Sequence, residues 1–258
     1  MTARVLVTRP AGTWLQLTAR FAGTGVVLQM SETTVQVDPI DGRPGDVAID
    51  RLAGYDWLVV TSGRGVAALR ARLAARGLTD LPPDLHVAAV GPATAAALSA
   101  AGHRVDLVAG EASSDGLYAA LARHAAGGAR LLIIRPEGAP GSLAAALRAA
   151  GGTVDEAPLY RTIASHGAGA LADAAIAGAF AAVVFTAPSA LDCWLDAAGA
   201  QRDDLVFALK CAARVAIGPT TKARLSAAGL PAAATADAPN ENAVGDALSR
   251  ALGVDLLP

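Results

Sequence analysis

Two short stretches of this chain combine glycine, proline and threonine in the same order. Gly91-Pro92-Ala93-Thr94 follows the apolar run 87–90, and Gly218-Pro219-Thr220-Thr221 follows the apolar run 215–217. A strand that ends in Gly-Pro-x-Thr places backbone N–H groups and a hydroxyl at the positive end of the next helix, where an anion binds well. The candidate anion-binding residues of these turns are Gly91, Thr94, Gly218, Thr220 and Thr221. Each threonine has a plainer alternative, which is to satisfy the first turn of its own helix.

Arginines and serines stand at comparable places after other apolar runs. Arg9 and Arg135 each end such a run directly before a proline. A guanidinium there suits a carboxylate or phosphate, although a local surface ion pair is the alternative. Further candidates lie in turns before predicted helices, where capping is the alternative, and these are Ser62, Gly63, Arg64, Ser189 and, in a glycine-rich turn, Gly138.

The same motifs recur at one spacing along the chain. Arg-Pro, Thr-Ser or Thr-Ala, Gly-Pro and a helix-capping Ser or Asn repeat at offsets between 125 and 127 residues (135 − 9, 186 − 61, 218 − 91 and 240 − 113). Ordered matches at one offset indicate an internal duplication.

Short β-branched runs alternate with helix-like segments, which predicts parallel α/β sheets. The motifs then fall at the carboxyl ends of strands, where such sheets bind ligands. Two such edges predict a two-domain protein with a cleft for a small polyanion. Residues 31–54 read as a linker, because Gly42-Arg43-Pro44-Gly45 is expected to break regular structure. Thr13 is expected to cap the first helix, and Asp155-Glu156 to be solvated.

Tyr160 lies in the polar, extended segment 158–162, which is the second half's equivalent of 31–37. A tyrosine on a segment that crosses between domains is a candidate hydrogen-bond donor or weak acid. Packing between the domains is the alternative.

Composition excludes several classes of protein. The formal net charge is −2 and charged residues make up 17%, so there is no basic surface typical of a nucleic-acid binder. No apolar run is long enough to span a membrane, and we expect no signal peptide at the start of the chain. The cysteines and histidines share no metal-ligand spacing, and no nucleotide-binding glycine motif occurs. We expect a cytoplasmic monomer with no metal, cofactor, nucleic-acid or membrane partner.

The ordered set of motifs resembles the uroporphyrinogen-III synthase family. The resemblance covers nearly the whole chain and rests on residues 5–10, 60–66, 90–94, 159–162, 184–190 and 217–221. It implies two parallel-sheet α/β domains (flavodoxin-like) joined by a two-stranded linker, with the ligand cleft between them. Domain 1 would be discontinuous, comprising 1–32 and 166–258; domain 2 would comprise 38–158; the linker strands would be 33–37 and 159–165.

The resemblance also implies a reaction and roles. The family closes linear hydroxymethylbilane, a tetrapyrrole polycarboxylate, into uroporphyrinogen III with inversion of ring D and without a cofactor. Tyr160 matches the tyrosine that assists departure of the hydroxyl, and the turn residues named above match substrate-binding positions. Ala187 stands where the family often has a hydroxyl. The alternative is a non-catalytic or regulatory binder of a small polyanion with the same fold.

Overall fold

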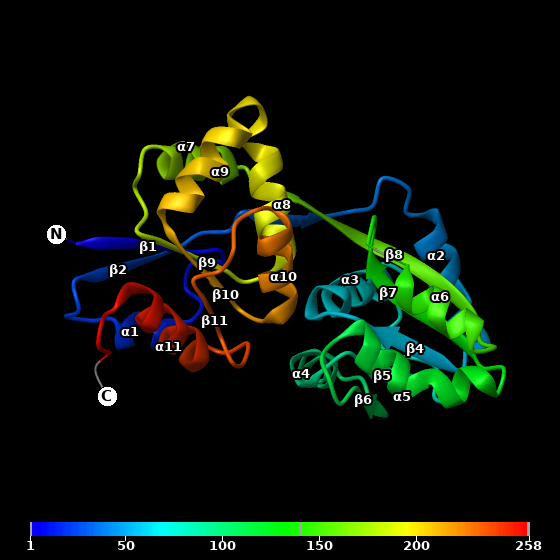
Figure 1. The fold of residues 1–258 in the computed structure, drawn as a ribbon. Coiled ribbons are helices and arrows are strands. Elements are labelled where there is room, and N and C mark those ends of the chain that lie inside the picture. Colours follow the sequence, from blue (N-terminus) through cyan, green and yellow to red (C-terminus); the bar gives the residue numbers. More distant parts are fainter. Residues whose placement is uncertain (1, 140, 257–258) are drawn as a thin grey trace. The chain divides into compact units, whose positions relative to one another are not determined.

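The structure, a computed structural model, describes residues 2–139 and 141–256. The chain folds into two compact units, each with its own mainly parallel sheet (Figure 1). Unit 1 comprises Met1–Val35 and Thr162–Pro258, and unit 2 comprises Gln36–Arg161. The α/β class predicted from the sequence is confirmed.

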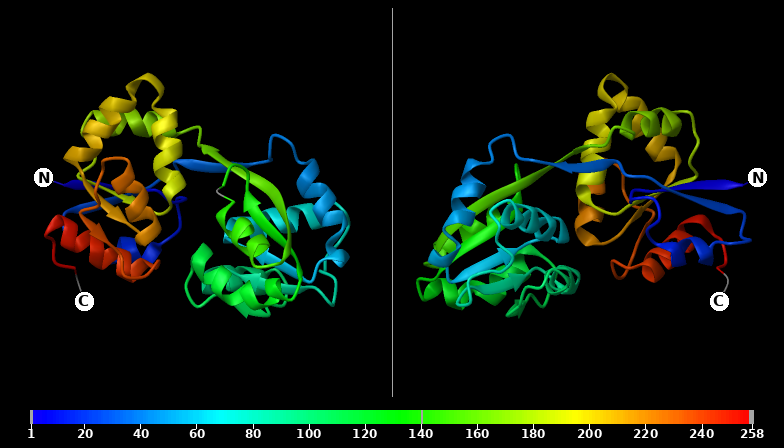
Figure 2. Two further views of the ribbon diagram at one scale, coloured as in Figure 1. Left: turned by 45° about the vertical axis from the view of Figure 1, so that its right-hand side comes forward. Right: turned by 180° about the vertical axis from the view of Figure 1, so that it is seen from behind.

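Unit 1 combines elements from both ends of the chain, as the blue and red parts of the ribbon show (Figure 2). Its strands lie in the order β11-β10-β9-β1-β2, and neighbouring strands pair in parallel. The elements are β1 (Ala3–Val7), α1 (Leu15–Arg20), β2 (Val26–Met30), α7 (Ala168–Ile176), β9 (Ala182–Phe185), α8 (Pro188–Ala197), the 3₁₀ helix η2 (Gly199–Gln201), α9 (Arg202–Cys211), β10 (Ala213–Ala216), α10 (Pro219–Ala227), β11 (Ala234–Thr235) and α11 (Glu241–Leu252).

Helices cover both faces of this sheet because side chains alternate between the faces along each strand. Leu6, Val183 and Phe185 pack against α7, α8, α9 and α10. Val5, Val7 and neighbouring strand residues pack against α1 and α11 on the other face. Burial on both faces explains why these strands read as continuous apolar runs.

Unit 2 has the same layered construction. Its strands lie in the order β3-β8-β7-β4-β5-β6, with α2, α3 and α4 on one face and α5 and α6 on the other. The elements are α2 (Arg43–Asp50), the 3₁₀ helix η1 (Leu52–Gly54), β4 (Trp57–Val60), α3 (Gly63–Ala74), β5 (His86–Ala89), α4 (Pro92–Ala100), β6 (Leu107–Val108), α5 (Ser114–Ala126), β7 (Arg130–Pro136) and α6 (Ser142–Ala149). The strands β3 (Thr34–Val37) and β8 (Thr153–Ala164) run from one unit into the other.

The strand orders of the two sheets support the internal duplication. The run β11-β10-β9-β1-β2 of unit 1 corresponds to β6-β5-β4-β7-β8 of unit 2. Corresponding strands begin 125 to 127 residues apart (234 − 107, 213 − 86, 182 − 57, 130 − 3 and 153 − 26). Each folded unit takes strands from both sequence halves, so the units do not coincide with the repeats.

Two local predictions were wrong. The segment Gly42-Arg43-Pro44-Gly45 does not break regular structure but begins α2, with Gly42 as its N-cap and Pro44 in the first turn. Proline fits there because the first turn of a helix needs no N–H from it. Thr13 does not cap α1; its hydroxyl donates to the Pro10 carbonyl at 2.7 Å, and Trp14 precedes the helix at φ 55°.

Within the described ranges, every helix is too short or too polar to cross a membrane.

The two Gly-Pro turns predict different responses to the same substitution. An added Cβ at Gly91 would lie 2.9 Å from the Ala112 Cβ, whereas one at Gly218 meets nothing within 4 Å. Both glycines are helix N-caps with an extended backbone. Any loss of capping by alanine is therefore the same in the two variants and does not distinguish them. We expect Gly91→Ala to lower the free energy of unfolding by about 1–3 kcal/mol and Gly218→Ala to change it by less than about 0.5 kcal/mol. Urea denaturation of both variants checks this; equal effects would contradict the predicted contact.

Candidate active site

Tyr160 and Ser62 meet at the carboxyl end of the unit 2 sheet. Tyr160 lies on β8, and Ser62 is the N-cap of α3, directly after β4. Their hydroxyl oxygens are 2.8 Å apart, and either can be the donor. The Ser62 Oγ also accepts from the Gly65 N–H at 3.0 Å. The capping alternative for Ser62 is therefore true, and the same hydroxyl contacts the candidate acid.

A β-bulge aims Tyr160 at this position. In the register of β7 against β8, Arg135 pairs with Pro158 but Pro136 pairs with Tyr160, so Leu159 is an extra residue in β8. Leu159 and Tyr160 consequently both join the core beneath α3, although neighbours in a regular strand point to opposite faces. Bulges are common beside active sites because they redirect a side chain in this way. The Tyr160 carbonyl accepts from the Glu137 N–H at 2.7 Å, which holds the bulge against β7.

The surroundings keep the Tyr160 phenol protonated. Burial raises its pKa above the ordinary value, while the hydrogen bond with Ser62 and the positive charge of Arg64 act in the opposite direction. At neutral pH the side chain is thus a proton donor, which is the form that an acid catalyst requires.

Tyr160 lines a hollow of about 370 Å³ in unit 2. Three alanines of α3 form one wall, with Arg64 and Arg72 on the same helix. Asp38, another lining residue, pairs with Arg72 at 2.9 Å, and its carbonyl accepts from Arg161. The hollow combines an apolar wall with charged groups, which suits a ligand that has both apolar and charged parts.

Arg135 lies at the end of β7, next to a second hollow of about 200 Å³. Its guanidinium pairs with Glu156, and Glu156 also pairs with Arg148 at 3.3 Å. The expectation that Glu156 is solvated was wrong, because the register of β7 and β8 places it opposite Ile133, near Arg135. Asp155 is exposed, as expected, and accepts a hydrogen bond from the Tyr55 hydroxyl at 2.7 Å. Because Glu156 pairs with both arginines, these three side chains together carry a net positive charge.

The remaining candidates of unit 2 lie after β4, β5 and β7. Gly91 and Thr94 are buried in the first turn of α4. Gly63 is exposed in the first turn of α3. Gly138 is exposed in a turn with φ +75°, and Pro140 of that turn lies outside the described residues. These turns share one edge of the sheet, because β5, β4, β7 and β8 are neighbours.

Unit 1 brings its own candidates to the carboxyl ends of β1, β9 and β10, which are also neighbours. The Arg9 guanidinium lies 4.4 Å from the centroid of the Trp14 ring. Ser189 is in the first turn of α8, and Thr220 is exposed while Thr221 is buried in the first turn of α10.

The sequence did not indicate Thr8, which lies between these turns. The Thr186 hydroxyl donates to the Thr8 carbonyl at 2.7 Å, and the Thr186 N–H donates to the Thr8 hydroxyl at 3.0 Å. These bonds fasten β1 to β9. In unit 2 the Thr61 hydroxyl makes a comparable bond to the Ile134 carbonyl at 3.0 Å. The sequence pattern that could have indicated these bonds is a threonine directly after β1 and another directly after β9.

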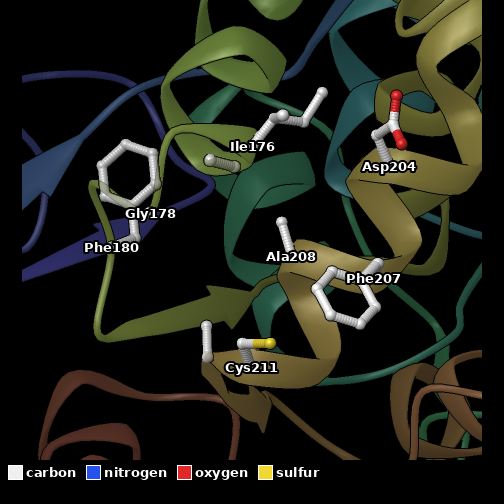
Figure 3. Close-up of a pocket in the computed structure, with 9 residues that line it drawn as sticks. Ile176, Gly178, Phe180, Asp204, Phe207, Ala208 and Cys211 are labelled. Atoms are coloured by element: carbon white, nitrogen blue, oxygen red, sulfur yellow. The ribbon is translucent and has the colours of Figure 1, made fainter.

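A third hollow lies at the opposite end of the unit 1 strands. It has a volume of about 370 Å³ and is lined by the ends of α7 and α9, with Phe180, Phe207 and Cys211 among its residues (Figure 3). These residues precede β9 and β10, so this hollow is separate from the turns described above. Across residues 2–139 and 141–256, no three His, Cys, Asp or Glu side chains cluster to hold a metal ion.

The raised pKa values of two tyrosines predict how the free energy of unfolding depends on pH. Burial, and then the hydrogen bond to Asp155, raises the pKa of Tyr55 to about 12; burial also raises the pKa of Tyr160. Above about pH 10 the unfolded chain releases these protons first, so the free energy of unfolding falls as the pH rises. We expect Tyr55→Phe and Tyr160→Phe each to make this fall shallower. Urea titrations across that pH range check it, and slopes equal to the wild type in both variants would contradict it.

Comparison with known proteins gives a consistent result. A family model described as uroporphyrinogen-III synthase HemD matches residues 30–244. A curated uroporphyrinogen-III synthase from Synechococcus elongatus is 32% identical over 161 residues, which span 61% of this chain and 60% of that protein. The chain thus spans less than two thirds of the length of that relative.

Solved structures show a similar fold. A mutant uroporphyrinogen III synthase from Thermus thermophilus aligns over 97% of this chain and 99% of its own, with a TM-score of 0.71 and 21% identity. A uroporphyrinogen-III synthetase from Helicobacter pylori aligns over 97% and 99%, with a TM-score of 0.59 and 18% identity. The family model covers most of the sequence and the fold agrees, so the chain belongs to the uroporphyrinogen-III synthase family.

Proposed function

We propose that this protein closes hydroxymethylbilane into uroporphyrinogen III with inversion of ring D. One observation carries the proposal within the family: a buried, protonated tyrosine, Tyr160, contacts Ser62 and lines a hollow that suits a carboxylate-bearing ring. A linear chain of four pyrroles that bears acidic side chains has apolar rings for the alanine wall of this hollow and carboxylates for its arginines.

In the proposed reaction, the lone pair of the ring A pyrrole nitrogen expels the terminal hydroxyl. The carbon–oxygen bond breaks, Tyr160 gives its proton to the departing oxygen, and water leaves. Ring D then attacks the resulting azafulvene through its substituted carbon to form a spiro intermediate, which fragments and closes the other way round. The pyrrole carbon that loses hydrogen at closure returns one proton, so the phenol is restored and the overall change is loss of one water. Positioning of the flexible substrate supplies much of the catalysis.

We assign Tyr160 as the catalytic residue, and we assign substrate carboxylates or pyrrole groups to the turns of both units. In unit 2 these are the turns with Gly63, Arg64, Gly91, Thr94, Arg135 and Gly138, and in unit 1 those with Arg9, Ser189, Gly218, Thr220 and Thr221. Arginine supports this assignment because its planar guanidinium binds a carboxylate through two parallel hydrogen bonds. Ala187 offers no side-chain hydroxyl, so only backbone N–H groups act at that point.

The proposed setting is the cytoplasm and the proposed state a monomer. The partner is a small tetrapyrrole, with no nucleic acid, membrane or added cofactor taking part. Light scattering of the purified protein checks the monomer.

The activity test supplies freshly prepared hydroxymethylbilane and separates the oxidised products by isomer. The proposal predicts isomer III in excess of isomer I, at a rate above spontaneous closure. Isomer I alone, formed at the spontaneous rate, would refute the proposed function.

Tyr160→Phe removes the acid and keeps the ring. We expect kcat to fall about 10²-fold, the lower end for general acid catalysis, because the substrate supplies most of the reactivity. Tyr118→Phe is the matched control, since Tyr118 is on α5 and 38% exposed. Steady-state kinetics check both variants. Equal rates for Tyr160→Phe and Tyr118→Phe would return Tyr160 to a packing role.

Arg135 and Glu156 give a test of carboxylate binding. Arg135→Gln removes a charged donor, so KM should rise about tenfold with kcat maintained. Glu156→Gln removes the acid that competes for Arg135, so KM should fall a few-fold at low salt. Arg20→Gln is the control, because Arg20 pairs with Asp246 at 2.7 Å between α1 and α11. The assignment fails if Arg135→Gln and Arg20→Gln leave KM at the same value.

A further inference from the structure

Two serines cap helices of unit 2 with the same geometry. Ser62 caps α3 and accepts from the Gly65 N–H at 3.0 Å, while Ser113 caps α5 and accepts from the Gly116 N–H at 3.0 Å. Both residues have extended backbones, with φ −167° and −147°. As helix caps the two are equivalent.

Ser62 differs from Ser113 in having a second side-chain partner among the described residues, the Tyr160 hydroxyl at 2.8 Å. A serine hydroxyl carries one proton and two lone pairs. The Gly65 N–H occupies one lone pair, which fixes the Ser62 oxygen and leaves its proton available to Tyr160. The cap thereby joins the positive end of α3 to the phenol oxygen.

Tyr160 needs such a donor because it is only 5% exposed. Giving up a proton there creates a phenolate in a place with little water, which is costly unless hydrogen bonds stabilise the charge. The charged groups of the adjoining hollow are Arg64 and Arg72 of α3 and Asp38 after β3. Asp38 already pairs with Arg72 at 2.9 Å.

We propose that Ser62 is a positioning residue that acts through Tyr160 and not through the substrate. When Tyr160 gives its proton to the departing hydroxyl, the Ser62 O–H donates to the phenolate oxygen, and its proton remains bonded to Ser62. The proton returned at ring closure goes to Tyr160, and Ser62 is unchanged over the cycle. This inference rests on the proposed function and replaces the sequence-based role of Ser62 as a substrate ligand.

Three variants separate capping from donation to Tyr160. Ser62→Ala removes both. Ser62→Asp keeps a good cap but, when ionised, has no proton to donate and repels a phenolate. Ser62→Thr keeps both functions. Ser113→Ala is the matched control. It removes an equivalent cap from α5, and among the described residues the Ser113 hydroxyl makes no hydrogen bond to a tyrosine.

The readouts are kcat with hydroxymethylbilane and the titration of Tyr160 by NMR of ring-labelled tyrosine, assigned with Tyr160→Phe. We expect Ser62→Ala and Ser62→Asp to raise the pKa of Tyr160 further and to lower kcat roughly tenfold to a hundredfold, with KM nearly unchanged. Ser62→Thr and Ser113→Ala should match the wild type in both measurements. The Tyr55 signal, which reports a hydroxyl bonded to Asp155, should be constant in all variants.

An unchanged Tyr160 titration in both Ser62→Ala and Ser62→Asp would overturn the inference, as would an equal loss of kcat in Ser113→Ala. A rise in KM with constant kcat would assign Ser62 to substrate binding. If the wild type itself produces no isomer III, the proposed function fails and the catalytic role of Ser62 fails with it. In that case the NMR titration alone still reports whether Ser62 donates to Tyr160.

Discussion

Parallel strand pairing is the constraint from which the candidate site follows. A parallel strand must be followed by a crossover before the next strand can pair, and in this chain the crossovers contain helices. Strand ends are then close to helix N-termini, and these ends share one edge of the sheet. The capping serines, Gly-Pro turns and arginines therefore lie along the same edge of a sheet although they are far apart in the sequence. The polarity of that edge is a property of the fold, and single side chains refine it.

The duplication shows how two equivalent edges diverge. Both units keep the same strand order, yet Ser62 of unit 2 corresponds to Ala187 of unit 1, where a cap hydroxyl is absent. Gly91 is enclosed by Ala112, whereas Gly218 faces open space. In unit 2 a cap hydroxyl meets Tyr160 across a bulge of β8. Unit 2 thus carries the proposed acid, and unit 1 has backbone N–H groups and threonines at the corresponding strand ends.

The sequence predicted the features that depend on local pattern or repetition. Apolar runs located the strands, the offsets near 126 residues revealed the duplication, and Ser113 and Asn240 were correctly expected to cap α5 and α11. Features that depend on register were missed. The pairing of Glu156 with Arg135 and the bulge at Leu159 both arise from how β8 lies against β7, which no local residue pattern specifies. The contact between Ser62 and Tyr160 joins residues 98 apart, so it too needed the fold.

The central claim is that the Tyr160 hydroxyl meets the reacting end of the substrate. The most direct measurement is a crystal structure with a bound bilane that lacks the leaving hydroxyl and therefore cannot cyclise. The account predicts that the unsubstituted terminal carbon lies beside Tyr160, with the phenol oxygen about 3–3.5 Å away and still bonded to Ser62. A bilane bound with its terminal carbon remote from Tyr160, in contact with a different acid, would contradict it.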